Sequence, residues 1–191
     1  MINRAMASPI TRSILIGLTV LSLASIAWSL YGFASSQIRA SWQNSLEIAG
    51  ERYISALKDI QTGYRDYYNR GTSEALAPYL RAKAKLDSYI ATFREAAAKV
   101  ALPAEISDRM IGEGHRLVDY SERLVAARNR SFVEAQAVSR AREGNEALNK
   151  VREDVRVLGS WLQRERDAIT ERTDRVYFPV AINALFALAL V

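Results

Sequence analysis

The chain has 191 residues, of which 49% are hydrophobic and 25% charged, and its formal net charge is +5. This length allows one domain with a core of its own besides any membrane segment. The absence of cysteine excludes disulfides, thiolate catalysis and cysteine-based metal sites. Acidic and basic residues alternate without a lysine or arginine block, which argues against nucleic acid as a partner.

The first uncharged stretch is Ser13–Phe33, about 21 residues long, which is enough for a helix that crosses a hydrocarbon layer of roughly 30 Å. Arg4 and Arg12 precede it and favour a cytoplasmic N-terminus. We therefore expect a cytoplasmic flank over 1–12 and a transmembrane helix over 13–33. A cleaved signal peptide is the alternative, because residues 25–27 resemble a cleavage site. The apolar run continues past that site, which favours an uncleaved anchor.

The next segment, 34–175, contains all of the acidic residues. After it, 176–191 is again uncharged and is still apolar where it ends, so it predicts the start of a second, truncated transmembrane helix. We therefore expect 34–175 to be an extracytoplasmic domain, periplasmic or extracellular, between two helices of the inner membrane. The lipid bilayer is then one partner of the chain.

Four segments of this domain repeat apolar residues at alternating steps of three and four, which is typical of helices packed in a bundle. The repeating positions are Leu46, Ala49, Tyr53, Ala56, Ile60, Gly63 and Tyr67; Leu76, Tyr79, Leu86, Ile90, Phe93, Ala97 and Val100, with Lys83 at one step; Ile106, Met110, Leu117, Ser121, Leu124 and Arg128; and Leu148, Val151, Val155, Leu158, Leu162 and Ile169. The predicted fold is all-α. It is an antiparallel up-down-up-down four-helix bundle whose long first and last helices are continuous with the two flanking transmembrane helices.

Two glycines predict turns at one end of this bundle. Gly71 suits the left-handed conformation that ends a helix, and Thr72 can cap the following one. Gly144 predicts the last turn, with Asn145 as the N-cap. Because the helices alternate in direction, we expect Gly71 and Gly144 to lie together at the tip, the end of the bundle away from the membrane.

The third helix is bounded by two local signals. Pro103 is suited to a first-turn position because its φ is already helical. Ser131 and Glu134 form a Ser-x-x-Glu capping box, which predicts a break near Arg130 and a short helix over 132–141.

One motif precedes the first turn. The chain reads TGYRDYYNRGTSEALAPY from Thr62 to Tyr79. This stretch resembles the signature of the third class of CHASE domains, extracellular sensory modules associated with cyclases and histidine kinases, which reads Thr-Gly-x-Arg-Gly-Tyr-Leu-Leu-Thr-Gly-Asp before a Pro-Tyr pair. The matching residues are Thr62, Gly63, Arg65, Tyr67, Gly71, Leu76, Pro78 and Tyr79.

A second signature of this class is matched more loosely by Gly144, Leu148, Val151 and Arg152. The resemblance covers roughly 34–175. It implies a sensory input domain between two membrane helices that feeds a cytoplasmic kinase or cyclase.

The motif also supplies the candidate sensing residues, which are Thr62, Gly63, Tyr64, Arg65, Tyr67 and Tyr68. Glycine inside a helix costs about 1 kcal/mol relative to alanine, so Gly63 indicates either the close approach of another helix or a ligand contact. For Arg65 the alternatives are an ion pair with Asp66 or Glu74 and a role in ligand binding. The three tyrosines Tyr64, Tyr67 and Tyr68 either belong to the core or to an interface between helices, or form the floor of a pocket.

The sequence contains no paired catalytic carboxylates, nucleophile elbow, phosphate-binding glycine loop or metal-ligand cluster. The only histidine, His115, lacks the acidic neighbour of a phosphoacceptor. We therefore expect no enzyme within these 191 residues, and neither a cofactor nor a metal.

The resulting expectation is the extracytoplasmic input domain of a bacterial transmembrane receptor, specifically a sensor histidine kinase of a two-component system. It would act as a homodimer and pass a conformational signal across the membrane in response to an unidentified small molecule or protein. Two alternatives remain. One is the input domain of a diguanylate cyclase, adenylate cyclase or chemotaxis receptor, and the other is a membrane-anchored structural bundle without cytoplasmic output.

Overall fold

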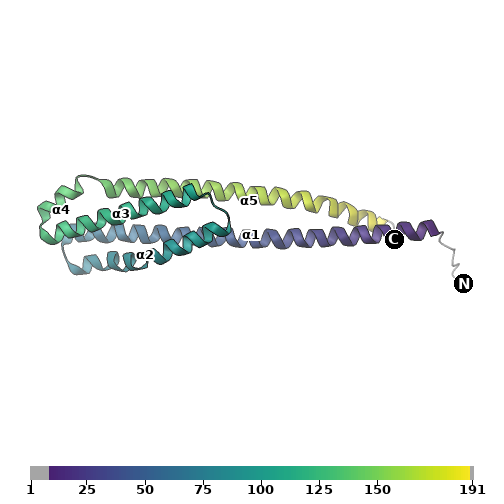
Figure 1. Ribbon diagram of the computed structural model, residues 1–191, viewed down its shortest axis with the longest axis horizontal. Coiled ribbons are helices and arrows are strands. Elements are labelled where there is room, and N and C mark those ends of the chain that lie inside the picture. The colour runs from purple at the N-terminus through teal and green to yellow at the C-terminus, as the bar shows by residue number, and fades with distance from the viewer. Residues whose placement is uncertain (1–8, 190–191) are drawn as a thin grey trace. The chain divides into compact units, whose positions relative to one another are not determined.

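The computed structural model describes residues 9–189, apart from the side chains of 9–12, 14, 15, 18 and 172–189. Every regular element in this range is a helix, which confirms the predicted all-α class (Figure 1). The helices are α1 (Pro9–Arg70), α2 (Ser73–Lys99), α3 (Ala104–Arg130), α4 (Phe132–Ser139) and α5 (Glu143–Ala189).

The chain divides into two compact units. Ser41–Gln163 forms the bundle, which contains the end of α1, all of α2, α3 and α4, and the start of α5. Met1–Ala40 and Arg164–Val191 form the other unit. Both α1 and α5 therefore contribute to each unit.

The bundle has the four long segments side by side, with successive segments running in opposite directions (Figure 1). Most of the repeating apolar positions of the sequence face its interior, whereas Ile169 belongs to the other unit. Among the largest fully buried side chains are Leu46, Tyr53, Leu57, Ile60, Phe93, Met110, Leu117, Leu148 and Val151. Burial of these side chains removes apolar surface from water, which is the main favourable contribution to folding.

Tyr53 of α1 connects three helices at the centre of the core. Its ring stacks on Phe93 of α2 with the centroids 6.0 Å apart, and its hydroxyl donates to the carbonyl of Met110 in α3 at 3.0 Å. Gly114 leaves room for this tyrosine, because a Cβ there would lie 1.8 Å from the hydroxyl oxygen. Burial raises the pKa of Tyr53.

The break between α3 and α4 lies where the capping box predicts it. The hydroxyl of Ser131 accepts the backbone N–H of Glu134 at 3.1 Å, and α4 follows over Phe132–Ser139. The reciprocal half of the box is not formed, since the Glu134 carboxylate accepts from Arg130 instead.

The turn between α1 and α2 is also confirmed. Gly71 has a φ of +71°, and its N–H donates to the carbonyl of Tyr67 at 2.8 Å. Thr72 occupies the N-cap position of α2, but its side chain makes no capping hydrogen bond. Hydrogen bonds from the backbone N–H of Glu74 itself and from the hydroxyls of Thr72 and Ser73 lower the pKa of the Glu74 carboxyl instead.

The prediction for the last turn is wrong in its details. The left-handed residue is Arg142, with a φ of +54°, and α5 already begins at Glu143. Gly144 and Asn145 therefore lie within the first turn of α5, and Asn145 is not its N-cap. Gly144 has a packing role, because a Cβ there would lie 2.5 Å from the ring of Tyr120.

In the other unit, residues 13–33 form an uninterrupted part of α1. Their large apolar side chains are mostly exposed, for example Trp28 at 69% and Tyr31 at 74%. Within the part of the chain that the structure describes, no helix is long and apolar enough to span a bilayer. The predicted segments 1–12 and 176–191 lie outside the residues whose side chains are described.

Candidate functional site

The predicted sensing residues lie at the tip, which consists of the last turns of α1 and α3, α4 and the first turn of α5 (Figure 1). A hydrogen bond from Gln61 to the side-chain oxygen of Asn145, 3.3 Å long, joins α1 to α5 there. Gly71 and Gly144 are thus at the same end of the bundle, as predicted, although Gly144 lies within α5.

Tyr64 is the most buried of the three candidate sensing tyrosines, with 3% of its surface exposed. Its ring meets that of Tyr120 edge to face, with centroids 5.7 Å apart and planes at 76°. Burial, and secondly the charge of Tyr120, raises the pKa of Tyr64 to about 12. Gly144 completes the contact, because any Cβ at this position would overlap both tyrosines.

Tyr67 and Tyr68 bind the end of α3 and α4. The hydroxyl of Tyr67 donates to the side-chain oxygen of Asn129. The ring of Tyr68 packs on Phe132 with the centroids 5.4 Å apart, and its hydroxyl accepts from Ser139 at 3.4 Å. These contacts support the reading of the tyrosines as helix contacts.

Arg128 of α3 holds the end of α1. Its Nε donates to the backbone carbonyl of Tyr68 at 2.9 Å, and the guanidinium carbon lies 5.1 Å from the centre of the Phe132 ring. The bond satisfies one of the carbonyls that a helix leaves unpaired in its last turn. A Cβ at Gly71 would lie 2.6 Å from this guanidinium. The sequence feature that could have indicated this role is that Arg128 occupies a repeating position that is otherwise apolar.

Gly63 brings α1 and α2 together. A Cβ at this position would lie 2.5 Å from the backbone nitrogen of Tyr79 and 2.7 Å from its Cβ. This contact confirms the interpretation of Gly63 as a close approach of two helices. The neighbouring Thr62 is exposed on the bundle surface.

Arg65 is exposed and borders a cavity of about 190 Å³ at the tip. Tyr64, Tyr68, Tyr120 and Asn145 also line this cavity. The predicted ion pair with Asp66 or Glu74 does not occur among the described residues. The arrangement thus combines tyrosine rings, an amide and a free guanidinium, which can bind a small polar group or ordered water.

The tip therefore brings Tyr64, Arg65 and Tyr68 to one cavity, whereas Gly63 and Tyr67 serve helix packing. Tyr120 and Asn129 were missed as members of this site, because nothing near them in the sequence indicates which helix they face. In the described part of the chain, no three histidine, aspartate or glutamate side chains are grouped as ligands of a metal ion.

Comparison with known proteins identifies the domain. The family model described as the CHASE3 domain matches residues 47–175, which is more than half of the chain. The searches of curated proteins and of solved structures found no match to the chain. The matched range contains the tip and its motif from Thr62 to Tyr79. The chain thus belongs to the CHASE3 family of extracellular sensory domains, which are found in signalling receptors.

Proposed function

We propose that this chain is the input region of a transmembrane receptor of the histidine kinase class, with the bundle outside the cytoplasm. The observation that carries the proposal is the CHASE3 match over 47–175, on a bundle whose first and last helices extend beyond the matched range. The alternatives are a cyclase or a chemotaxis receptor as the output, and a structural bundle without output.

The membrane attachment is supported by the N-terminal part of α1. Residues 13–33 carry no charge, and their exposed apolar side chains include Ile16, Leu23 and Trp28. A contiguous exposed apolar surface favours contact with lipid or with another protein. We propose that this segment is the first membrane helix and that 176–191 begins the second.

Signal transmission is supported by the continuity of α5, which runs from Glu143 to Ala189 without a break. A stimulus that shifts the packing of the bundle changes the position or rotation of this helix. We propose that α5 passes that change to the output domain. A homodimer provides the partner helix against which such a movement is read.

Helix insertions in the full-length receptor test this mechanism. One residue added to an α-helix rotates everything beyond it by about 100°, whereas seven restore nearly the original face. A single alanine inserted after Arg175 should lock or invert the output, and a seven-residue helical insertion should preserve its sign. The measurement is phosphorylation of the receptor with and without its stimulus.

The two insertions are matched controls for each other, because both lengthen the same helix at the same point. An unchanged response in both variants would show that the connection is a flexible tether. The coding sequence after Val191 tests the class of output. An ATPase domain that follows a phosphoacceptor helix supports the kinase, whereas a cyclase domain or a stop codon contradicts it.

A further inference from the structure

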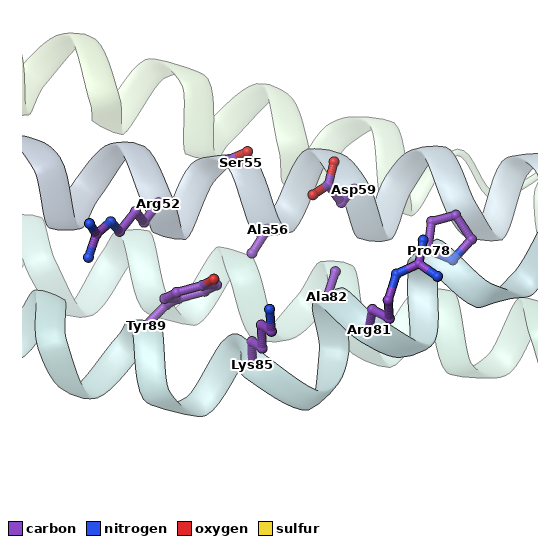
Figure 2. A pocket seen from close by; sticks show the side chains of 9 residues that line it. All are labelled: Arg52, Ser55, Ala56, Asp59, Pro78, Arg81, Ala82, Lys85 and Tyr89. Carbon is purple, nitrogen blue, oxygen red and sulfur yellow. The ribbon is translucent and has the colours of Figure 1, made fainter.

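A groove of the bundle lies between α1 and α2, outside the tip. It has a volume of about 380 Å³ and is shown in Figure 2. Ala56 of α1 and Ala82 of α2 form its floor, and both are buried. Because both floor side chains end at Cβ, they leave the space between the helices unfilled.

Three cations line this α1/α2 groove, Arg52 from α1 and Arg81 and Lys85 from α2. All three are exposed, and none of them forms an ion pair with a carboxylate in the described part of the chain. The one acidic residue of the lining, Asp59, points away from α2 (Figure 2). The groove thus carries positive charge that the bundle itself does not neutralise.

The neighbouring cation on α2 behaves differently. Lys83 pairs with Glu122 of α3 at 2.6 Å, and this hydrogen bond raises the pKa of Lys83. Arg81 and Lys85, by contrast, are four residues apart on one helix face, where like charges repel each other. A bound anion would remove this repulsion as well as gain charge-assisted hydrogen bonds.

The other lining groups define the ligand further. In Figure 2 Lys85 and Tyr89 extend from α2 towards α1, and Pro78 adds an apolar surface near Arg81. Arg81 and Lys85 are separated by about 6 Å along the helix axis. That spacing suits a small molecule with two anionic groups, each of which faces one of these cations.

We propose that the α1/α2 groove is a binding site for a small dianion of the dicarboxylate or phosphate type. Arg81 and Lys85 bind its anionic oxygens, and Arg52 adds a third positive charge from α1. Because such a ligand bridges α1 and α2, its binding changes how the two helices pack.

The inference gives the proposed sensory function a ligand class, and in this respect it rests on that function. Binding is measured on the purified 191-residue chain without an output domain. A failure to bind an anion therefore differs from a failure of the insertion experiment, which needs no identified ligand.

The test is calorimetric titration of the chain in mild detergent at low salt with succinate, inorganic phosphate and acetate. We expect succinate or phosphate to bind, and acetate to bind about tenfold more weakly or not at all, because it carries one charge. The succinate and phosphate arms distinguish the two chemical types of dianion. No binding of either at about 10 mM would overturn the proposal.

Paired variants locate the site. Arg81→Gln combined with Lys85→Gln should weaken binding about tenfold or more. Arg94→Gln is the control, because Arg94 is exposed on the same helix but lies outside the groove, and it should change the affinity less than about twofold. Equal effects of the two changes would overturn the proposal, since they would show binding to the general positive charge.

A third variant decides the matter if the double variant loses its helical circular dichroism. Asp59→Asn removes the one negative charge of the lining without removing a cation. It should strengthen dianion binding by a few fold, because Asp59 repels the ligand. An unchanged or weaker affinity in this variant would overturn the proposal.

Discussion

Two grooves of the bundle have similar sizes but opposite arrangements of charge. The α3/α5 groove has a volume of about 310 Å³ and is lined by Arg116, Arg123 and Lys150 together with four carboxylates. Its cations are paired within the groove, Arg116 and Lys150 with Glu113 at 3.0 and 3.7 Å, and Arg123 with Glu143. Among the residues whose side chains are described, the cations of the α1/α2 groove have no such partners.

The difference reflects how each pair of helices is held together. Between α3 and α5, ion pairs accompany the packing and extend to Arg109 and Asp154, whose side chain is only 5% exposed. Between α1 and α2, the close contact of Gly63 with Tyr79 brings the helices together. The cations of the α1/α2 groove take no part in this contact. A groove whose charges are already paired stabilises the fold, whereas one with free charges can bind a ligand.

The largest effect is expected where α1 and α2 touch. Gly63→Val should lower the free energy of unfolding by about 3 kcal/mol, because the new side chain overlaps the backbone of Tyr79, which no rotamer change relieves. Gly112→Ala is the control, since a Cβ there has open space. It should stabilise the helix by up to about 1 kcal/mol. Urea unfolding followed by circular dichroism measures both, and a loss of the same size in both variants would contradict the close contact.

The next effect concerns the tyrosines where the α3/α5 groove meets the tip. The pKa of Tyr64 is raised from 10.0 to about 12 in the folded chain. Below pH 10 the hydroxyl is neutral in both states, so the contribution of Tyr64 to the free energy of unfolding is fully present there. Between about pH 10 and 12 the unfolded chain loses the proton first, and the free energy of unfolding should fall by about 2 kcal/mol.

Tyr64→Phe isolates this contribution, because phenylalanine does not titrate. The stability advantage of the wild type over this variant should shrink as the pH rises from about 10 to 12. Burial raises the pKa of Tyr120 as well, so the variant retains some loss of stability at high pH. A constant difference between the two proteins across this range would contradict the burial of the Tyr64 hydroxyl.

The same substitution, arginine to glutamine, beside the buried carboxylate of Asp154 and in the α1/α2 groove gives the most direct test, and its second half has the smallest expected effect. Arg109→Gln should cost about 2 kcal/mol, because it leaves the buried carboxylate of Asp154 without its cation. Arg81→Gln should instead stabilise the chain by about 0.3 kcal/mol, because it removes the repulsion from Lys85. Thermal unfolding at low salt measures the two changes, and equal losses would show that Arg109 and Arg81 do not differ in charge pairing.

The sequence by itself determined the local features of this domain. The steps of three and four predicted four long helices and most of the buried positions, since a helix has 3.6 residues per turn regardless of its surroundings. Gly71 and the Ser131 cap were also readable, because each depends on residues within one helical turn. The motif from Thr62 to Tyr79 indicated the family that the match over 47–175 shows.

Only the tertiary structure decided which residues of different helices meet. Gly144 looked like a turn residue, but its small size serves the contact of Tyr64 with Tyr120. Each of the two grooves is lined by two arginines and one lysine, so the types of cation do not reveal which groove has its cations paired. The reason is that such contacts depend on the rotation and register of whole helices, which the packing of the complete core sets and no short stretch of sequence encodes.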